Sequence, residues 1–389
     1  MINITRLAAQ IVEQAIETVA QETNVYLVGS VGLAAIACFT AYVYNQRYNE
    51  RSGQNAQLQQ LDAAAPLQEL EAVAPPDVNQ NAQLQTLNLS SNHLQEVDLS
   101  LNAQLQKLNL SYNELEAVDL RHNTQLQKLN LSFNKLGAVD LSYNTHLQEL
   151  NLSRNELPAV DLRHNTQLQK LNLSRNELGA VDLRQHAQLR KLNLSTNNLL
   201  GGVDLSQNTQ LQTLYLSDNQ LAAVDLSYNT QLQELNLSAN ELGAVDLRQH
   251  AQLRKLNLST NNLLAGVDLS QNTQLQTLDL SENLFVASPD VSDNTQLQTL
   301  YLSHNRLTEL HDSILSLSRE CYVDVQFNNF SPEYIAEFEE RLRLHRLAHP
   351  DQGPTVLFSI QDDVAPAQPV SLEERLAPWS QEEHPERGA

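Results

Sequence analysis

Residues 105–125 read LQKLNLSYNELEAVDLRHNTQ, and residues 126–146 repeat the pattern as LQKLNLSFNKLGAVDLSYNTH. Copies return every 21 or 22 residues from Leu84 to about Phe330. The eleven clear copies begin at Leu84, Leu105, Leu126, Leu147, Leu168, Leu189, Leu211, Leu232, Leu253, Leu275 and Leu297. Because one copy of this length cannot bury its own leucines, the copies must stack on one another.

Within each copy, the run L-x-x-L-x-L alternates apolar and polar residues, as a short strand with one buried face does. Stacked copies then place these strands side by side in parallel. A period of 21 or 22 residues built on Leu and Asn is typical of a leucine-rich repeat. The sequence therefore predicts an α/β leucine-rich-repeat solenoid over residues 84–329, with a curved parallel β-sheet on its concave face.

An Asn follows each predicted strand, where the chain turns. We expect its side-chain amide to bind backbone groups of neighbouring copies. This column has a structural role in our interpretation. It comprises Asn92, Asn113, Asn134, Asn155, Asn176, Asn197, Asn219, Asn240, Asn261, Asn283 and Asn305.

Two stretches, 177–200 and 241–264, have the same sequence, ELGAVDLRQHAQLRKLNLSTNNLL. This identity indicates tandem duplication of a three-repeat block. A face copied without change has had little opportunity to fit one ligand at each position. We therefore expect a broad, repetitive binding face in this half of the repeats.

The chain carries 24 basic and 46 acidic side chains, a net charge of −22. Ten of the acids form one column on the return side of the repeats: Asp98, Asp119, Asp140, Asp161, Asp182, Asp204, Asp225, Asp246, Asp268 and Asp290. We expect each to accept hydrogen bonds from turn amides. The alternative is a cation-binding ladder, but the Gly-rich pattern of calcium-binding repeats is absent from the sequence. No metal site and no cofactor is predicted.

The exposed strand positions have a different composition. Most carry Asn, but Tyr215, Asp279 and Tyr301 interrupt the column. Aromatic and Arg side chains beside Lys are typical of protein-binding patches. The candidate partner-binding residues of the concave face are Tyr112, Phe133, Arg154, Arg175, Lys107, Lys128, Lys170, Lys191, Tyr215 and Tyr301. The alternative is that these side chains are only the solvent-exposed surface of the sheet. We expect no nucleic acid partner, because the overall acidity opposes attraction to phosphates.

The N-terminus predicts a membrane attachment. Residues 25–44, VYLVGSVGLAAIACFTAYVY, contain no charge and have the length of a transmembrane helix. Residues 1–24 precede it and read as an amphipathic helix, too long and acidic for a cleavable signal peptide. The alternative is a buried hydrophobic hairpin packed on the first repeat. Residues 45–83 form a linker with a degenerate capping repeat, marked by Leu58, Leu61, Leu70 and Val73.

The charges around this segment predict its orientation. Arg47 and Arg51 follow it and Glu residues precede it, which places the repeats in the cytosol. Eight strand Asn residues also lie in N-L-S glycosylation patterns. Sugars there would cover the exposed face, which argues against passage through a eukaryotic secretory lumen.

The C-terminal residues 330–389 predict a cap. An altered strand lies within 314–330, and a helix from Glu333 to about His349 offers Tyr334, Phe338, Leu342 and Leu347 to cover the last leucine layer. The following segments are PDQGP (350–354), VLFSI (356–360) and SLEERL (371–376), before Trp379. In this order, residues 310–380 resemble the junction between the repeats and the catalytic domain in the NEL family of secreted bacterial ubiquitin ligases.

This resemblance implies a type III effector whose repeats select a host protein and whose catalytic domain transfers ubiquitin from a Cys. The chain departs from the family's pattern: its repeats use V-D-L, and the sequence stops at Ala389, where the catalytic domain would begin. Neither Cys38, inside the apolar segment, nor Cys321, in the last strand, lies in the family's Cys-x-Asp motif. Both are interpreted as packing residues. No catalytic residue is therefore predicted.

Three functions remain open. The first is a membrane-anchored protein-binding module, a truncated NEL-type effector that keeps its substrate-recognition arm and is secreted into a host cell. The second is a component of ubiquitin transfer whose catalytic half is supplied elsewhere. The third is a bacterial surface or adhesion protein.

Overall fold

The computed structural model describes residues 82–199, 201–263 and 266–359. The predicted amphipathic helix (1–24) and transmembrane helix (25–44), and nearly all of the predicted linker (45–83), lie outside these residues. So do residues 360–389 of the predicted C-terminal cap (330–389). Within the described ranges, no helix combines the length and the apolar composition that crossing a bilayer requires.

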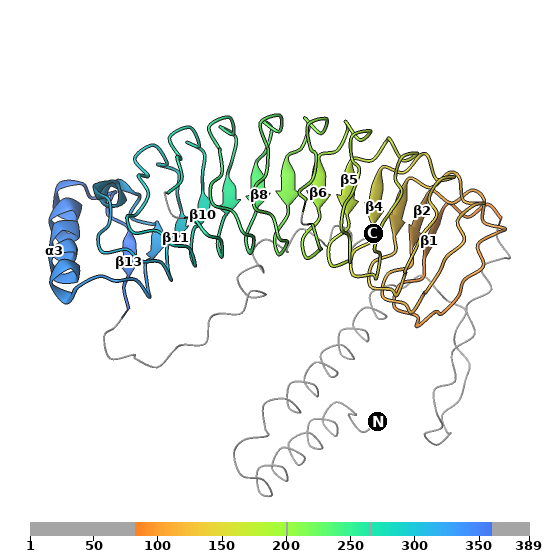
Figure 1. Ribbon diagram of the computed structural model, residues 1–389, viewed down its shortest axis with the longest axis horizontal. Coiled ribbons are helices and arrows are strands. Elements are labelled where there is room, and N and C mark those ends of the chain that lie inside the picture. Colours follow the sequence, from red (N-terminus) through yellow and green to blue (C-terminus); the bar gives the residue numbers. More distant parts are fainter. Residues whose placement is uncertain (1–81, 200, 264–265, 360–389) are drawn as a thin grey trace, which may run out of the picture. The chain divides into compact units, whose positions relative to one another are not determined.

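Each of the eleven predicted copies contributes one three-residue strand to a single parallel sheet (Figure 1). The strands pair only with the strands of the preceding and following copies, and equivalent residues face one another, as Leu108 faces Leu129. They are β1 (Thr86–Asn88), β2 (Lys107–Asn109), β3 (Lys128–Asn130), β4 (Glu149–Asn151), β5 (Lys170–Asn172), β6 (Lys191–Asn193), β7 (Thr213–Tyr215), β8 (Glu234–Asn236), β9 (Lys255–Asn257), β10 (Thr277–Asp279) and β11 (Thr299–Tyr301). The predicted parallel solenoid is confirmed.

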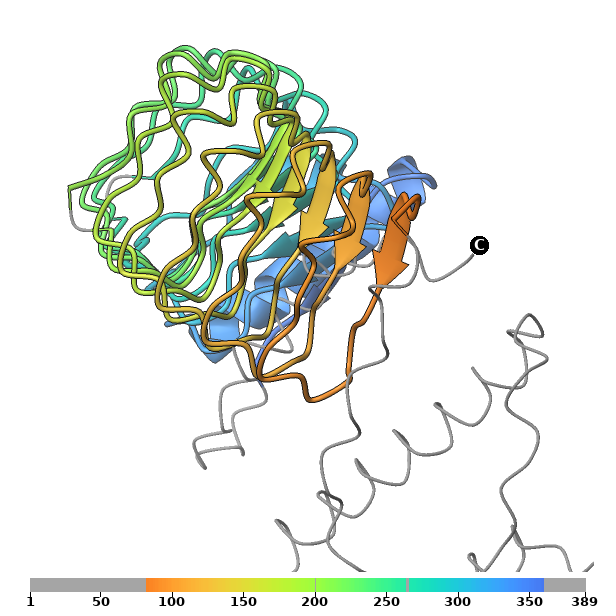
Figure 2. The same ribbon diagram turned by 90° about the vertical axis from the view of Figure 1, so that its right-hand side faces the viewer.

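The sheet and the return loops form opposite sides of the coils (Figure 2). The leucines between them make up the buried core. In the coil of β3, Leu126, Leu129, Leu131, Leu136 and Leu141 are all at most 2% exposed. Burying a Leu side chain contributes about 1.5–3 kcal/mol. Most coils repeat this set, and Phe285 and Val291 replace two of its leucines in the coil of β10, so the core is continuous from coil to coil and stabilises each strand against its neighbours.

The Asn that follows each strand forms a ladder along the core, which we call the strand-side ladder. The Nδ2 of Asn155 donates to the carbonyls of Leu131, one coil back, and Leu152, both at 3.0 Å. Its Oδ1 accepts from the amide of Leu136, also one coil back. The predicted role of this column is confirmed from Asn113 to Asn305. Asn92, in the first described coil, donates only to the local Ser90 carbonyl.

A cap closes the C-terminal end of the coils. The predicted altered strand is β12 (Tyr322–Asp324), which follows a 3-10 helix, Asp312–Ser316. The predicted helix is α3 (Pro332–Ala348), which begins at the N-cap Ser331, whose hydroxyl accepts from the amide of Tyr334. Phe338 and Leu342 of α3 are buried against the last coils.

Two features of the cap differ from the predictions. Leu347 is 70% exposed and does not cover the core, because the helix has turned it away from the face that buries Phe338. Residues 355–357, which were not predicted as a strand, form β13 (Thr355–Leu357) beside β12. Gly353, with a φ of +87°, makes the turn into β13, and its carbonyl accepts from Nε of Arg346 at 3.0 Å.

Candidate functional site

The sheet face carries the candidate residues. For each coil we define it as the residue before the strand, the first and third strand residues, and the residue three positions after the strand. The sequence predicted this face to be the concave one. The second strand residue points inward, as Leu108 and Leu129 do, so the first and third residues point outward.

The third strand residue, usually Asn, has a structural role. The Oδ1 of Asn109 accepts from the amide of Ser111 at 3.0 Å and from its hydroxyl at 2.8 Å. The same amide contact recurs through Asn257, and Asp279 replaces Asn with the same geometry. These Asn side chains therefore order the chain after the strand, and the distinctive chemistry of the face lies in the other positions.

The first strand residue forms a column of charged side chains. In it, Lys128 and Lys170 bind Glu149 from both sides, at 3.1 and 3.3 Å. Burial raises the pKa of Glu149, but the hydrogen bond from Lys128 and the charge of Lys170 outweigh this effect, so that the pKa lies below its ordinary value. Glu149 is thus ionised at neutral pH. The predicted residues Lys107 and Lys191 lie at the ends of this stretch of the column.

The position three residues after the strand carries a stack of side chains. The rings of Tyr112 and Phe133 lie 4.0 Å apart and nearly parallel, and the guanidinium carbon of Arg154 lies 4.5 Å from the centre of the Phe133 ring. Arg175 occupies the same position in the next coil. The four residues share a left-handed φ of 55–56°. The structure thus places the four predicted residues in adjacent coils as one row, which we call the aromatic–arginine stack.

Tyr215 and Tyr301 lie on β7 and β11, outside this stack. The hydroxyl of Tyr215 donates to Glu234 at 2.7 Å. Tyr301 contacts Tyr322 edge to face at 6.3 Å. The sequence analysis missed a second stack in the same column, formed by His304 and Phe327 with ring centres 4.4 Å apart. The recurrence of the position could have revealed it.

The Asp column of the return side binds turn amides. In all ten, Oδ1 accepts from the amide two residues later, as Asp98 accepts from Ser100 at 2.9 Å; the others are Asp119, Asp140, Asp161, Asp182, Asp204, Asp225, Asp246, Asp268 and Asp290. Four also pair with Arg, and the Arg163 hydrogen bonds hold the pKa of Asp161 at about 2. The predicted turn role is confirmed.

A second ladder, missed by the sequence analysis, lies on the return side of the core. We call it the return-side ladder: Asn102, Asn123, Asn144, Asn165, His186, Asn208, Asn229, His250, Asn272 and Asn294, each at most 1% exposed. The Nδ2 of Asn123 donates to the carbonyls of Leu99 and Asn102, in the preceding coil. The periodic recurrence of Asn at this position was visible in the sequence, but its polar surroundings do not indicate that it is buried.

His replaces Asn twice in this ladder. Nε2 of His186 lies 3.1 Å from the carbonyl of Leu162, and His250 makes the equivalent contact with Leu226. A carbonyl only accepts, so Nε2 carries the proton in the neutral ring. His can take the place of Asn because the ladder uses the side chain as a donor. Burial lowers the pKa of both rings below the usual 6.5.

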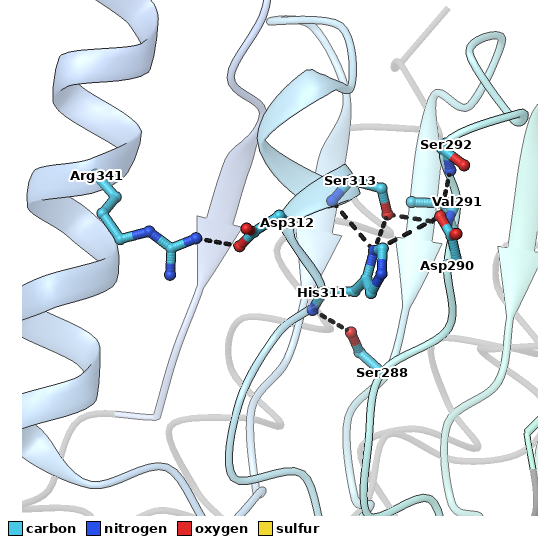
Figure 3. Close-up of polar contacts among 8 residues, drawn as sticks. All are labelled: Ser288, Asp290, Val291, Ser292, His311, Asp312, Ser313 and Arg341. Carbon is cyan, nitrogen blue, oxygen red and sulfur yellow. Dashed lines mark hydrogen bonds and ion pairs between the residues drawn. The ribbon is translucent and has the colours of Figure 1, made fainter.

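The described residues contain neither a reactive cysteine nor a catalytic triad. Cys321 is 1% exposed, and burial raises the pKa of its thiol to about 11, so the thiolate nucleophile is disfavoured. Asp290, His311 and Ser313 lie together beside the cap (Figure 3). Asp290 and Ser313 both approach the same Nδ1 of His311, at 3.5 and 2.9 Å, whereas a triad uses both ring nitrogens.

This cluster instead fixes the cap. His311 is the N-cap of the 3-10 helix, and the Ser313 hydroxyl accepts from the amide of Val291 at 3.0 Å. Asp312 pairs with Arg341 of α3 (Figure 3). The contacts therefore join one coil, the 3-10 helix and α3.

Comparison with known families finds leucine-rich repeats along the chain. The family model of two leucine-rich-repeat copies matches residues 209–249. Single-repeat models match residues 122–142, 143–157 and 164–184 in one case and 296–317 in another. A search of curated protein sequences gave no match.

Solved structures show the same fold. The functional domain of InlJ from Listeria monocytogenes is 26% identical, with a TM-score of 0.52, and the match covers 64% of each chain. That domain is described as including a cysteine ladder, whereas the buried ladders here consist of Asn and two His.

Two further structures are below 25% identity and show the fold alone. The leucine-rich-repeat protein LIC12759 of Leptospira interrogans is 24% identical, with a TM-score of 0.54, over 73% of this chain and 86% of that one. The effector protein YopM of Yersinia pestis is 22% identical, with a TM-score of 0.52, over 63% of this chain and 78% of that one. The family matches, the parallel sheet and the strand-side ladder show that the described coils of this chain are leucine-rich repeats.

Proposed function

We propose that the chain is a protein-binding module that captures its partner on the sheet face, with the aromatic–arginine stack at the centre of the contact. The stack is the observation that carries the proposal. Tyr112 is 46% exposed although it stacks on Phe133, and Arg154 covers the other side of that ring. Rigid aromatic and Arg side chains supply most of the binding energy in protein interfaces.

Replacement of Tyr112, Phe133, Arg154 and Arg175 together by Ala tests this proposal. The four-residue variant of the full chain should lose capture of the partner, because an anchor truncation costs about 2 kcal/mol or more at a hot spot. Affinity capture from host and bacterial lysates, followed by mass spectrometry, measures the loss. The matched control is the variant His304→Ala/Phe327→Ala, which removes the second stack of the same column and should leave capture unchanged. Equal capture by the four-residue variant would place the site elsewhere.

We also propose that residues 25–44 anchor the module in a membrane with the repeats in the cytosol. The uncharged stretch and the Arg residues behind it support this. Carbonate extraction of membranes should leave the full chain in the pellet, and protease added to intact cells should spare the repeats. Cleavage of the repeats under these conditions would favour the adhesion protein instead.

The resemblance to NEL ligases suggests that this module is the substrate-recognition arm of a truncated effector, secreted into a host cell. The N-cap Ser331 and the helix α3, followed by the segments PDQGP and VLFSI, support the proposal, because the resemblance rests on this order. The alternative, in which a catalytic half supplied elsewhere completes ubiquitin transfer, requires a partner with a reactive Cys.

Cys321 has no part in such a transfer. Replacing it with Ala should lower the free energy of unfolding by about 1 kcal/mol, because a buried sulfur is lost from a packed core. Urea unfolding measures this change. A ubiquitin thioester trapped on Cys321 of the wild-type chain would contradict the packing role.

A further inference from the structure

The charges of the sheet face are separated along the solenoid. In the coils of β2 to β6, seven basic side chains and one acidic side chain, Glu149, occupy the face, a net charge of +6; the basic residues are Lys107, Lys128, Arg154, Lys170, Arg175, Arg190 and Lys191. We call this region the basic half. It lies within a chain of net charge −22.

The coils of β7 to β12 have the opposite sign. There the face carries five acids, Asp218, Glu234, Asp279, Glu282 and Asp324, and two basic residues, Arg254 and Lys255, a net charge of −3. Lys255 is paired with Glu234 at 3.0 Å. We call this region the acidic half. The separation means that a charged partner is attracted to one half and repelled by the other.

The aromatic–arginine stack lies entirely in the basic half. The stack and the column of first strand residues are two rows that run across the same strands, since each coil of β2 to β5 contributes one residue to each row; the column holds Lys107, Lys128, Glu149 and Lys170, and Glu149 pairs with both neighbouring lysines. Five neighbouring strands span about 19 Å, the length of about six residues of extended chain. The two rows differ in chemistry: one offers ammonium groups and the other flat rings and guanidinium groups.

We infer that the basic half binds an acidic linear peptide segment of a protein partner, whose carboxylates face the lysines and whose apolar side chains lie on the stack. Arg binds carboxylates through two parallel hydrogen bonds, and clusters of Arg recognise acidic motifs. The inference rests on the proposed function, because it names the chemistry of that partner. A single-stranded nucleic acid offers rings and negative charge as well. The acidic half and the Asp column oppose a long polyanion, which favours a short acidic peptide.

The duplicated blocks supply the test. Arg190 and Arg254 are the same residue in two identical stretches, both exposed, one in the basic half and one in the acidic half. The probe is the fluorescein-labelled peptide EELEEYEELEEG, and its anisotropy is measured with the full chain in low salt. Wild type should bind the probe, and 0.5 M NaCl should weaken binding. A peptide with Lys in place of each Glu should not bind.

The matched variants give the expected pattern. Arg190→Glu should weaken probe binding by about threefold, whereas Arg254→Glu should not weaken it. The triple variant Lys107→Glu/Arg190→Glu/Lys191→Glu should weaken it by about tenfold or more. Equal effects of Arg190→Glu and Arg254→Glu, or unchanged binding by the triple variant, would overturn the inference. Circular dichroism of each variant should match wild type, since all the changed side chains are on the surface.

Two other occupants are outcomes of the same experiment. Tighter binding of a fluorescein-labelled dT12 than of the peptide would assign the basic half to nucleic acid. The acids of residues 361–389 are a second competitor. Tighter peptide binding by the variant Asp362→Asn/Asp363→Asn/Glu373→Gln/Glu374→Gln would assign the site to the chain's own tail. Either result overturns the inference. If the four-residue stack variant loses capture of its partner while the triple variant keeps peptide binding, the proposed function stands and only the inference fails.

Discussion

The identical stretches 177–200 and 241–264 have the same interior and different surfaces. Asn197 and Asn261 make the same four hydrogen bonds, and His186 and His250 occupy equivalent positions of the return-side ladder. On the sheet face, however, Lys191 has Lys170 and Thr213 as its neighbours, whereas Lys255 has Glu234 and Thr277. The interior of a coil is therefore determined by its own sequence, and its surface chemistry by the coils beside it.

The largest expected effect tests whether the buried Asn residues of the two identical stretches contribute equally to stability. Asn197→Ala leaves the Leu178 amide and the Leu173 and Leu194 carbonyls without the Asn. Buried groups left unpaired in this way should lower the free energy of unfolding by about 2–4 kcal/mol. Asn261→Ala should have the same effect within error. Urea unfolding of both variants measures it. A clear difference between them would show that neighbouring coils also determine the interior.

A smaller effect concerns pH and the buried His pair. Burial lowers the pKa of His186 and His250, and the hydrogen bonds of the rings with backbone groups, followed by the charges of Asp182 and Asp246, only partly oppose this. As pH falls from 7.5 through 6.5, the unfolded chain binds protons at these rings and the folded chain does not. The free energy of unfolding should therefore decrease with falling pH, and it should be at its full value above 6.5.

His186→Asn/His250→Asn should flatten this dependence, because Asn is the usual residue of the ladder and does not titrate. Urea unfolding at pH 7.5 and pH 5.0 measures the change, since the Asp column, with pKa values lowered from 3.8, stays ionised over this range. His186→Asn and His250→Asn should each remove an equal share of the pH dependence. A variant with the same slope as wild type would refute the prediction.

The smallest expected effect comes from a substitution that gives one lysine of the sheet face the neighbouring residues of its counterpart. Glu234→Lys gives Lys255 the neighbours that Lys191 has, and it removes both the 3.0 Å ion pair between Lys255 and Glu234 and the hydrogen bond from Tyr215 to Glu234. The free energy of unfolding should change by less than about 1 kcal/mol, because the pair is partly exposed. Acetylation by an N-hydroxysuccinimide ester, followed by mass spectrometry, should be slower at Lys255 than at Lys191 in wild type. The variant should reduce this difference; an unchanged ratio would mean that the neighbours do not set the reactivity.

The repeated positions made most of the fold predictable. Residues that recur at one spacing predict the eleven coils, the strand-side ladder and the turn role of the Asp column. Each of these predictions is supported by every copy of the repeat. The return-side ladder was equally periodic but was missed, because an Asn in a polar loop segment gives no sign that it is buried. β13 was missed because it occurs once, after a helix, outside the period.

The candidate site was predictable in part for the same reason. Tyr112, Phe133, Arg154 and Arg175 share one repeat position, so their placement in adjacent coils follows from the period. That Tyr112 and Arg154 both stack on Phe133 could not be read from spacing, because it depends on side-chain directions set by the left-handed backbone. The charge separation of the face was hidden by the net charge of −22, since the Asp column and the acids of both terminal segments lie outside the sheet face.

The left-handed position after each strand recurs in twelve coils with Ser, Tyr, Phe, Arg, Thr, Asp, Ala, Glu or His, and never with Gly. A left-handed residue other than Gly costs about 1–2 kcal/mol, so Gly would relieve the backbone at every one of these places. The main chain nonetheless holds the same angle whichever side chain is present. The side chains at these twelve positions can therefore be exchanged without a change in backbone conformation, so that binding specificity could be altered one coil at a time.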